Sequence, residues 1–417
     1  MSQFDSTRAD EAIKRIRSAE VELTLQDAEG KPLRWQEATV AQIRHKFLFG
    51  VYGADIVTAT NAADPAEREL AEARVEKLTA LFNYVTLPFY WARFEPQPGR
   101  PMTTQIRQAA QWAVDHHLLV KGHPLCWHTL APEWLLPLSN ADILKAQLGR
   151  IRREVTDFSD LIHMWDGLNE AVIMPVFDRY DNGITRVCKE LGRIELIRRV
   201  FGKAREANPQ ATLILNDFDM SPAYDILVEG CLEAGIHIDA IGIQSHMHQG
   251  YWGVEKTLQI LEHFSRFGLP IHFTETTLVS GHLMPAEIVD LNDYQGDEWP
   301  TTPEGEERQR RETLWHYKTL LAHPLVEGIT WWDLADGGWL HAPAGLIRQD
   351  GTAKPAYEEL LGLVKGEWWL PPTRLTTDEE GRIRFNGFLG EYELRMGEAR
   401  KAFQVDRPGM NRMEVRF

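Results

Sequence analysis

The sequence predicts a (β/α)8 barrel, an α/β fold of eight parallel strands each followed by a helix, with a small flanking β-module. Three observations predict it. Eight short apolar runs recur between residues 46 and 365, longer segments with helical periodicity separate them, and polar side chains cluster where the runs end. Because active sites of such barrels lie at the C-terminal ends of the strands, the clustered polar residues are expected to form one site.

The predicted strands are short and rich in apolar residues, and they cover residues 46–51, 82–87, 119–126, 161–169, 211–216, 238–244, 270–275 and 327–333. Between them lie segments such as 64–81 and 184–208, which start with acidic residues and repeat apolar positions at i, i+3 and i+4. Eight strand–helix units within residues 46–365 favour a closed barrel over an open doubly wound sheet.

Two flanking pieces lie outside the predicted barrel. Residues 1–45 read as a helix and a β-hairpin, and residues 366–417 are rich in strand formers separated by turns. We expect the two pieces to pack as one accessory β-module with a structural role. Sugar binding at Trp368 and Trp369 is the alternative role for this module.

The composition excludes several classes of partner. The chain of 417 residues carries 45 basic and 61 acidic side chains, a formal charge of −16, so it is expected to repel nucleic acid and anionic membranes. Its 14 tryptophans fit stacking on sugar rings, although large core residues explain part of the excess. The three cysteines lack metal-ligand spacing and are expected to be buried thiols.

The sequence shows no apolar leader and no run that approaches the length of a membrane span. We therefore expect a cytoplasmic protein, or a secreted one if a leader has been removed. The sequence does not predict the oligomeric state.

Two glutamates are the candidate catalytic residues. Glu170 and Glu275 each end a short apolar run that reads as a strand. A carboxylate at the end of a buried strand costs free energy unless chemistry uses it. Glycoside hydrolysis needs two carboxyl groups, one as proton donor and one as nucleophile or base, so this pair predicts that reaction.

At these residues the chain resembles glycoside hydrolase family 10, best known for endo-β-1,4-xylanases. The resemblance covers the whole barrel and rests on ordered motifs at residues 122–128 (GHPLCWH), 165–171 (WDGLNEA), 242–246 (GIQSH), 273–275 (FTE), 328–332 (GITWW) and 354–357 (KPAY). It implies a carbohydrate substrate, β-1,4-linked and xylan-type, cleaved with retention of configuration.

Roles follow from the resemblance. Glu170 would be the general acid and then the base, and Glu275 the nucleophile, with their carboxyls about 5–5.5 Å apart. Mutual repulsion would keep Glu170 protonated near neutral pH. Asn169 would donate a hydrogen bond to the sugar 2-hydroxyl, while His246 would orient Glu275 with Gln244 nearby.

Aromatic and histidine side chains complete the expected sugar-binding surface. The residues after the third strand and at the eighth strand are expected to contact sugar rings, and they are His123, Trp127, His128, Trp332 and Trp339. The His246-Met247-His248 spacing could also suggest a metal site. Because the family uses no metal, we expect neither a metal nor a cofactor.

One segment departs from the family pattern. The family's second strand continues into a Glu-Asn-x-x-Lys-Trp segment that binds the glycone sugars, and residues 86–96 lack its Glu, Asn and Lys. Tyr90, Trp91 and Arg93 are the candidates to replace those contacts. We therefore expect cleavage of a β-glycosidic bond, with a substrate other than ordinary long xylan as the best one.

Three alternatives stay open at this point. The same barrel could serve a retaining β-glycosidase of different glycone specificity, such as a β-glucosidase or β-galactosidase. It could form a non-catalytic carbohydrate-binding barrel, although a binding protein has no need for two costly buried carboxylates. A transglycosylase would use the same covalent intermediate.

Overall fold

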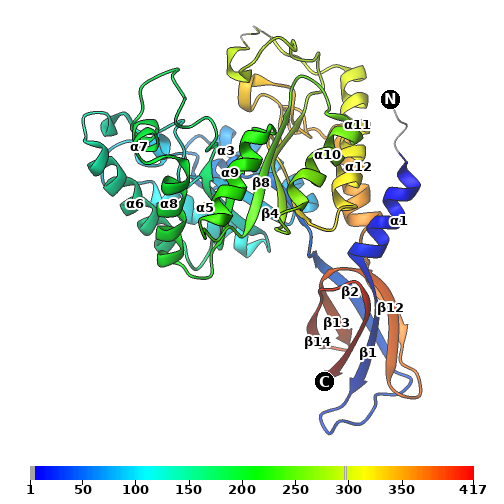
Figure 1. Ribbon diagram of the computed structural model, residues 1–417. Coiled ribbons are helices and arrows are strands. Elements are labelled where there is room, and N and C mark those ends of the chain that lie inside the picture. Colours follow the sequence, from blue (N-terminus) through cyan, green and yellow to red (C-terminus); the bar gives the residue numbers. More distant parts are fainter. Residues whose placement is uncertain (1–4, 295, 297) are drawn as a thin grey trace.

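The computed structural model describes residues 5–294, 296 and 298–417, and in it eight parallel strands close into a barrel (Figure 1). Their order around the barrel is β10-β3-β4-β5-β6-β7-β8-β9. The strands are β3 (Leu48–Tyr52), β4 (Tyr84–Pro88), β5 (Leu119–His123), β6 (Met164–Asn169), β7 (Thr212–Asp217), β8 (Ala240–Met247), β9 (Ile271–Leu278) and β10 (Val326–Trp331). Each overlaps one predicted strand, so the predicted barrel is confirmed.

Helices cover the outside of the barrel (Figure 1). They are α2 (Ala54–Asn61), α3 (Pro65–Leu81), α4 (Trp91–Phe94), α5 (Thr103–Asp115), α6 (Asn140–Asp157), α7 (Gly183–Leu191), α8 (Arg193–Ala207), α9 (Pro222–Glu233), α10 (Gly253–Ser265), α11 (Pro303–Leu321) and α12 (Pro355–Gly362). Short turns of 3₁₀ helix lie at Glu133–Leu135, Leu291–Asp293 and Trp339–His341, and a π turn at Leu363–Glu367 follows α12.

Local chemistry sets several helix ends. The Asp64 side chain accepts a hydrogen bond from the amide of Ala66, and Pro65 occupies the first helical position of α3. The predicted segment 184–208 is two helices, because Gly192 adopts a φ of 80° and ends α7 before α8 begins.

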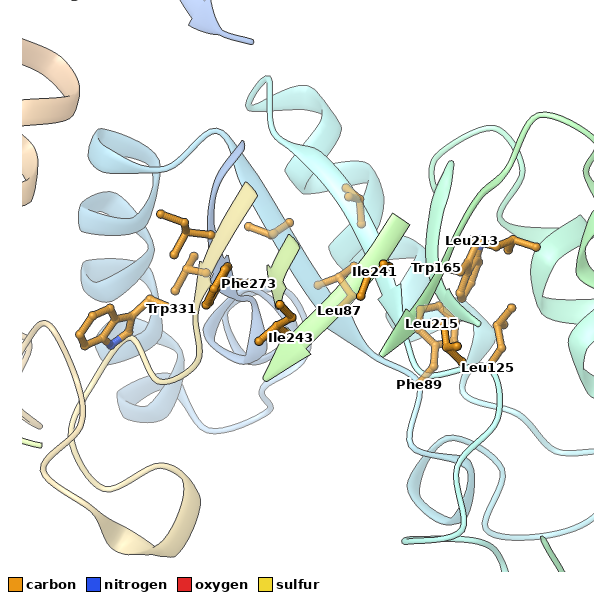
Figure 2. Close-up of a cluster of buried hydrophobic side chains, with 14 of the residues drawn as sticks. Leu87, Phe89, Leu125, Trp165, Leu213, Leu215, Ile241, Ile243, Phe273 and Trp331 are labelled. Atoms are coloured by element: carbon orange, nitrogen blue, oxygen red, sulfur yellow. The ribbon is translucent and has the colours of Figure 1, made fainter. Parts of the chain in front are cut away.

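The main core lies between the strands and the surrounding helices. Figure 2 shows its side chains from several strands, among them Trp165, Leu213, Leu215, Ile241 and Ile243, all fully buried. Along a strand these apolar residues alternate with side chains that point into the barrel, as the two-residue period of a strand requires.

The flanking strands do not form the predicted hairpin. Strand β1 (Ser18–Gln26) pairs with β12 (Arg382–Phe388) and β15 (Gly409–Arg416), whereas β2 (Glu37–His45) lies in a second sheet. That sheet has the order β11-β2-β13-β14, with β11 (Thr373–Thr376), β13 (Gly390–Met396) and β14 (Ala399–Val405). Alternate residues of both sheets share one small apolar core, so the N- and C-terminal strands make a β-sandwich below the barrel in Figure 1.

The predicted N-terminal helix belongs to the barrel rather than to the β-sandwich. In α1 (Ser6–Arg17) the Arg17 guanidinium donates hydrogen bonds to the carbonyls of Leu321, His323 and Val326, at the start of β10. The sandwich joins the barrel at this N-terminal end, where β2 leads into β3. Residues 1–4 of the predicted N-terminal segment lie outside the described residues.

Trp368 is not a sugar platform. It is 2% exposed and its ring stacks on Phe49 at 6.1 Å, inside the barrel core. The position of the sandwich at the N-terminal ends of the strands also keeps it away from their C-terminal ends, where barrel active sites lie.

The connection predicted at residues 276–304 begins later, because β9 continues to Leu278. Trp299 is buried within it, against Tyr294 at 4.6 Å, and forms a core of its own with residues of the β10–α12 connection. Residues 295 and 297 lie outside the described part of the chain. Within the described residues, every helix is either too short or too polar to cross a lipid bilayer.

Candidate active site

Polar side chains meet inside the barrel near the C-terminal ends of its strands. The Thr274 hydroxyl donates a hydrogen bond to Asn216 Oδ1 over 2.5 Å, and Asn216 Nδ2 donates to Glu275 Oε1 over 2.9 Å. Strands β7 and β9 are separated by β8 in the barrel order, so side chains that bond between them must point into the interior.

Glu170 follows the last residue of β6 and stands at this interior edge. Its carboxylate accepts hydrogen bonds from Trp127 Nε1 at 2.7 Å, and from Asn169 Nδ2 and Gln244 Nε2 at 3.2 Å each. Its backbone has a φ of 57°, an uncommon conformation for a residue with a side chain. The amide of Glu170 donates to the carbonyl of Asn216, which holds the backbone in this conformation.

The Glu170 carboxyl is held in its protonated form. Its pKa is raised to about 8, mainly by withdrawal from water and also by the nearby charges of Glu275 and Asp217, while the hydrogen bonds from Trp127 and Gln244 act in the opposite direction. The expected repulsion by Glu275 is therefore a contributor, and burial is the larger cause.

Glu275 lies in β9 with 4% of its surface exposed, and both of its oxygens have partners. Oε1 accepts from Asn216, and Oε2 lies 3.0 Å from His246 Nε2. His123 Nδ1 approaches Oε1 to 4.0 Å. The two glutamates are joined through a short chain of amides, because Asn216 and Gln244 both also donate to Asn169 Oδ1.

A buried ion pair fixes His123. Its Nδ1 contacts Asp166 Oδ2 at 2.7 Å, and the same oxygen lies 2.7 Å from Lys121 Nζ, with both members of this pair fully buried. The charge of Lys121 and the contact with His123 hold the pKa of Asp166 below its usual value against the effect of burial. The ionised carboxylate thereby sets the orientation of the His123 ring.

Aromatic rings surround the two carboxyls. Trp332 lies 5.2 Å from the ring of His123 and 6.0 Å from that of His246, and the His246 ring is 4.6 Å from Trp339. Tyr90 lies 5.6 Å from His123. These contacts place Trp332, Trp339 and Tyr90 at the site, as expected from their positions after the strands.

Three predicted residues do not face the carboxyls. Trp91 is 3% exposed and donates its indole N–H to Glu95, so it is a core residue. His128 is 1% exposed and lies behind Trp127, packed on Phe177 at 4.5 Å. Arg93 is exposed, with its guanidinium 5.8 Å from the centre of the Tyr90 ring.

Sequence reasoning gave no site role to four further residues that contact the site, namely Tyr52, Lys121, Asp166 and Asn216. Asn216 is one of the polar residues that cluster where the apolar runs end, and Tyr52 ends β3, so the rule that found Glu170 and Glu275 also points to both. Lys121 and Asp166 lie inside strands, and their pairing depends on the barrel register.

Throughout residues 5–294, 296 and 298–417, no three His, Cys, Asp or Glu side chains come together in a way that could hold a metal ion. His246 and His248 do not act as paired ligands. His246 contacts Glu275, whereas His248 is fully buried beside Trp339, where burial lowers its pKa to about 3.

A family model described as Glycosyl hydrolase family 10 matches residues 46–362, the whole barrel. Endo-1,4-beta-xylanase C of Paenibacillus barcinonensis is 27% identical over 351 residues, covering 74% of this chain and 31% of that protein. Endo-1,4-beta-xylanase B of Thermotoga neapolitana is 28% identical over 219 residues, covering 49% of this chain and 61% of that protein. The chain thus spans less than two thirds of the length of either relative.

Among solved structures, a thermostable mutant of a xylanase from Cellvibrio japonicus is similar, with a TM-score of 0.62 and 25% identity. The likeness covers 77% of this chain and 98% of that one. The flanking β-sandwich lies outside the residues that the family model matches.

Proposed function

The chain belongs to glycosyl hydrolase family 10, and on that premise we propose that it hydrolyses β-1,4-linked, xylan-type oligo- or polysaccharides with retention of configuration. The family match and the xylanase relatives support the substrate class. One observation carries the reaction type: the two glutamates share one amide network, and burial raises the pKa of Glu170 to about 8.

A protonated Glu170 beside Glu275 suits a double displacement. At neutral pH Glu170 carries a proton that it can give to the glycosidic oxygen as the bond to the leaving group breaks. Glu275, held between Asn216 and His246, attacks the anomeric carbon and forms a glycosyl ester. Glu170, now ionised, takes a proton from water, which attacks the same carbon and releases the sugar and Glu275.

The neighbouring side chains assist both steps. Asn169 accepts hydrogen bonds from Asn216 and Gln244, so its amide is fixed beside Glu170 where a sugar 2-hydroxyl would lie. Trp127 holds the Glu170 carboxyl through its indole N–H. Trp332 and Trp339 offer apolar faces on which sugar rings can stack.

The test is turnover of aryl β-glycosides (xyloside, xylobioside, glucoside, galactoside and cellobioside) by the wild type and by Glu275→Ala and Glu170→Ala. We expect Glu275→Ala to lose activity by at least ~10³-fold on every substrate, because no nucleophile remains. Glu170→Ala should retain most activity with a dinitrophenyl leaving group and lose about 10²–10⁴-fold with a poor one. Glu72→Ala, at an exposed position of α3, is the matched control.

The panel also separates the other candidate functions. Turnover confined to the glucoside or galactoside would show that the substrate is not xylan-type and that the enzyme accepts another glycone sugar. The altered segment at residues 86–96 would explain that result. Sugar binding by calorimetry without turnover of any substrate would contradict hydrolysis and favour a binding protein. Longer products at high acceptor concentration would identify transglycosylation.

A further inference from the structure

A continuous arc of aromatic side chains lines one side of the barrel mouth. Trp332, Tyr52, Tyr90 and Trp127 follow or end four consecutive strands, β10, β3, β4 and β5. The Tyr52 ring stacks on Trp332 at 4.7 Å, and the Tyr90 ring lies 5.8 Å from Trp127. Tyr52, which ends β3, and Tyr90, which follows the neighbouring strand β4, join the two halves of the arc.

The arc runs from one catalytic carboxyl to the other. At one end Trp127 donates its indole N–H to Glu170. At the other end Trp332 lies 6.0 Å from His246, the residue that contacts Glu275. The His123 ring lies at the inside of the curve, within 5.6 Å of Tyr90. A sugar with its anomeric carbon at Glu275 would therefore have this aromatic arc along its glycone side.

On the opposite side of the mouth, two aromatic side chains are about half exposed. Tyr180, in the connection after β6, is 47% exposed, and Phe218, directly after β7, is 45% exposed. The general acid Glu170 directly follows β6, so the leaving group departs toward these residues. The two sides of the site thus differ, because aromatic contacts close the glycone side while exposed side chains flank the leaving-group side.

We propose that the arc of Trp332, Tyr52, Tyr90 and Trp127 limits the glycone side to a single sugar, so that the enzyme removes one residue at a time from the non-reducing end. This inference rests on the proposed hydrolysis of β-linked sugars. A second glycone sugar would have to place its hydroxyls against the rings of Tyr52 and Tyr90, which lie between Trp332 and Trp127 in the arc. Sugar hydroxyls left without partners against such apolar rings disfavour binding.

The first test follows the order in which products appear. Xylohexaose labelled at its reducing end is incubated with the wild type, and labelled products are separated during the first tenth of the reaction. Release of single sugars predicts labelled xylopentaose first, then labelled xylotetraose, with free xylose in equal amount. Early labelled xylotriose or xylobiose would overturn the proposal, because it requires several glycone sugars to bind.

The second test compares substrates with one and two glycone sugars but the same leaving group. We expect the wild type to prefer 4-nitrophenyl β-xyloside over the β-xylobioside by at least ~10-fold in kcat/KM. Tyr90→Ala should open the arc and shift this ratio at least ~10-fold toward the xylobioside. Tyr52→Ala should shift the kcat/KM ratio in the same direction. If one of the two variants does not fold, the other still tests the proposal.

Two control variants isolate the steric effect. Tyr90→Phe removes the hydroxyl but keeps the ring, so its preference should stay with the xyloside. Tyr180→Ala removes an exposed ring on the leaving-group side and should leave the ratio unchanged. A ratio unaltered in Tyr90→Ala and Tyr52→Ala would overturn the role of the arc.

Failure of the inference can be told from failure of the proposed function. If no xyloside is hydrolysed but glucosides are, the glucoside and cellobioside pair replaces the xylose pair and tests the arc in the same way. Turnover of the disaccharide glycosides in preference to the monosaccharide ones contradicts the single-sugar site while leaving the glycosidase reaction intact. Absence of turnover on the whole panel, equal to that of Glu275→Ala, contradicts the proposed function and the inference that rests on it.

Discussion

The indole nitrogen of Trp127 donates a 2.7 Å hydrogen bond to Oε2 of Glu170, and this bond opposes the effect of burial on the Glu170 pKa. Trp127 reaches this position from the connection after β5, and Glu170 from the end of β6. The bond therefore couples a sugar-stacking ring to the group proposed as the general acid. Substrate that packs on the ring also shields the carboxyl from water.

Replacement of Trp127 by Phe should change the pH dependence of the reaction. In the wild type, kcat/KM for a substrate with a poor leaving group should fall as pH rises through about 8, because Glu170 loses its proton there. The hydrogen bond lowers the pKa, so Trp127→Phe should move this alkaline limb to higher pH and reduce kcat/KM roughly 10-fold through lost orientation. Trp112→Phe, on α5, is the control. A limb that stays in place or moves to lower pH would contradict the role of the bond.

Glu170 should also weaken the fold at alkaline pH. Its pKa in the folded protein is about 8, above the ordinary value of 4.5, so the folded state holds an extra proton between these values. The contribution of this group to stability is complete below pH 4.5 and declines as pH rises toward 8. Glu170→Gln should therefore raise the free energy of unfolding by ~2–4 kcal/mol at pH 8 and leave it nearly unchanged at pH 4.5.

Urea unfolding at the two pH values measures this difference, with Glu72→Gln as an exposed control on α3. Burial raises the pKa of Asp217 and of Asp333 to about 7, so the Glu170→Gln variant should keep part of the decline between pH 4.5 and 7. Equal effects of Glu170→Gln at both pH values would show that its carboxyl titrates normally in the folded state.

The barrel and its two glutamates could be predicted because both depend on local sequence. A strand buried on both faces is an apolar run, and a carboxylate in or directly after it stands out, as Glu275 within β9 and Glu170 after β6 do. The hairpin prediction for β1 and β2 failed because their partners come from residues 382–416 and 373–396. Pairing across such separations depends on tertiary packing, which the local pattern does not record.

The predictions for individual site residues were wrong or incomplete for a related reason. Trp91 stands next to Tyr90 in the sequence, yet it turns into the core, where its indole N–H pairs with Glu95 and its ring lies 5.0 Å from the Arg150 guanidinium. Tyr90 precedes α4 and Trp91 is its first residue, so the directions of the two side chains depend on this short helix and position alone could not distinguish them. Tyr52 was missed although it ends a strand, since its role depends on its stacking against Trp332.

The long connection between β9 and α11 should be held by Arg179. Its guanidinium pairs with Asp290 at 3.1 Å and also with Asp293, so it links the connection after β6 to the connection after β9. These two long connections meet across the short ones that follow β7 and β8. We expect Arg179→Ala to increase the rate of proteolytic cleavage within residues 279–302, with a smaller difference from the wild type at high salt.

Arg198→Ala is the control, because Arg198 makes a comparable exposed ion pair with Glu195 on α8. The melting temperatures of both variants should lie near that of the wild type, since exposed ion pairs contribute about 0–1 kcal/mol each. Cleavage of Arg179→Ala at the wild-type rate would show that the apolar contacts around Trp299 hold the connection without the ion pairs.

Gly122 in β5 should be intolerant of any side chain. A Cβ at this position would lie 2.1 Å from the Trp165 ring, which is fully buried between strands and helices. Neither the strand backbone nor the packed indole can move far, so Gly122→Ala should lower the free energy of unfolding by at least ~2 kcal/mol. Since His123 follows directly, displacement of the strand should also reduce activity. Urea unfolding and kcat/KM for the preferred aryl glycoside measure the two effects.

Gly149 provides the matched comparison, because it is an exposed residue within α6 and a Cβ there would meet no atom within 4 Å. Gly149→Ala should raise the free energy of unfolding by about 0.5–1 kcal/mol, through the lower backbone entropy of alanine in the unfolded chain, and leave kcat/KM unchanged. Opposite signs for the two Gly→Ala changes would show that close packing of β5 against Trp165 keeps His123 in place beside Glu275. Two small effects of the same sign would mean that the barrel can repack around Gly122, and that the contact with Asp166 is enough to hold His123.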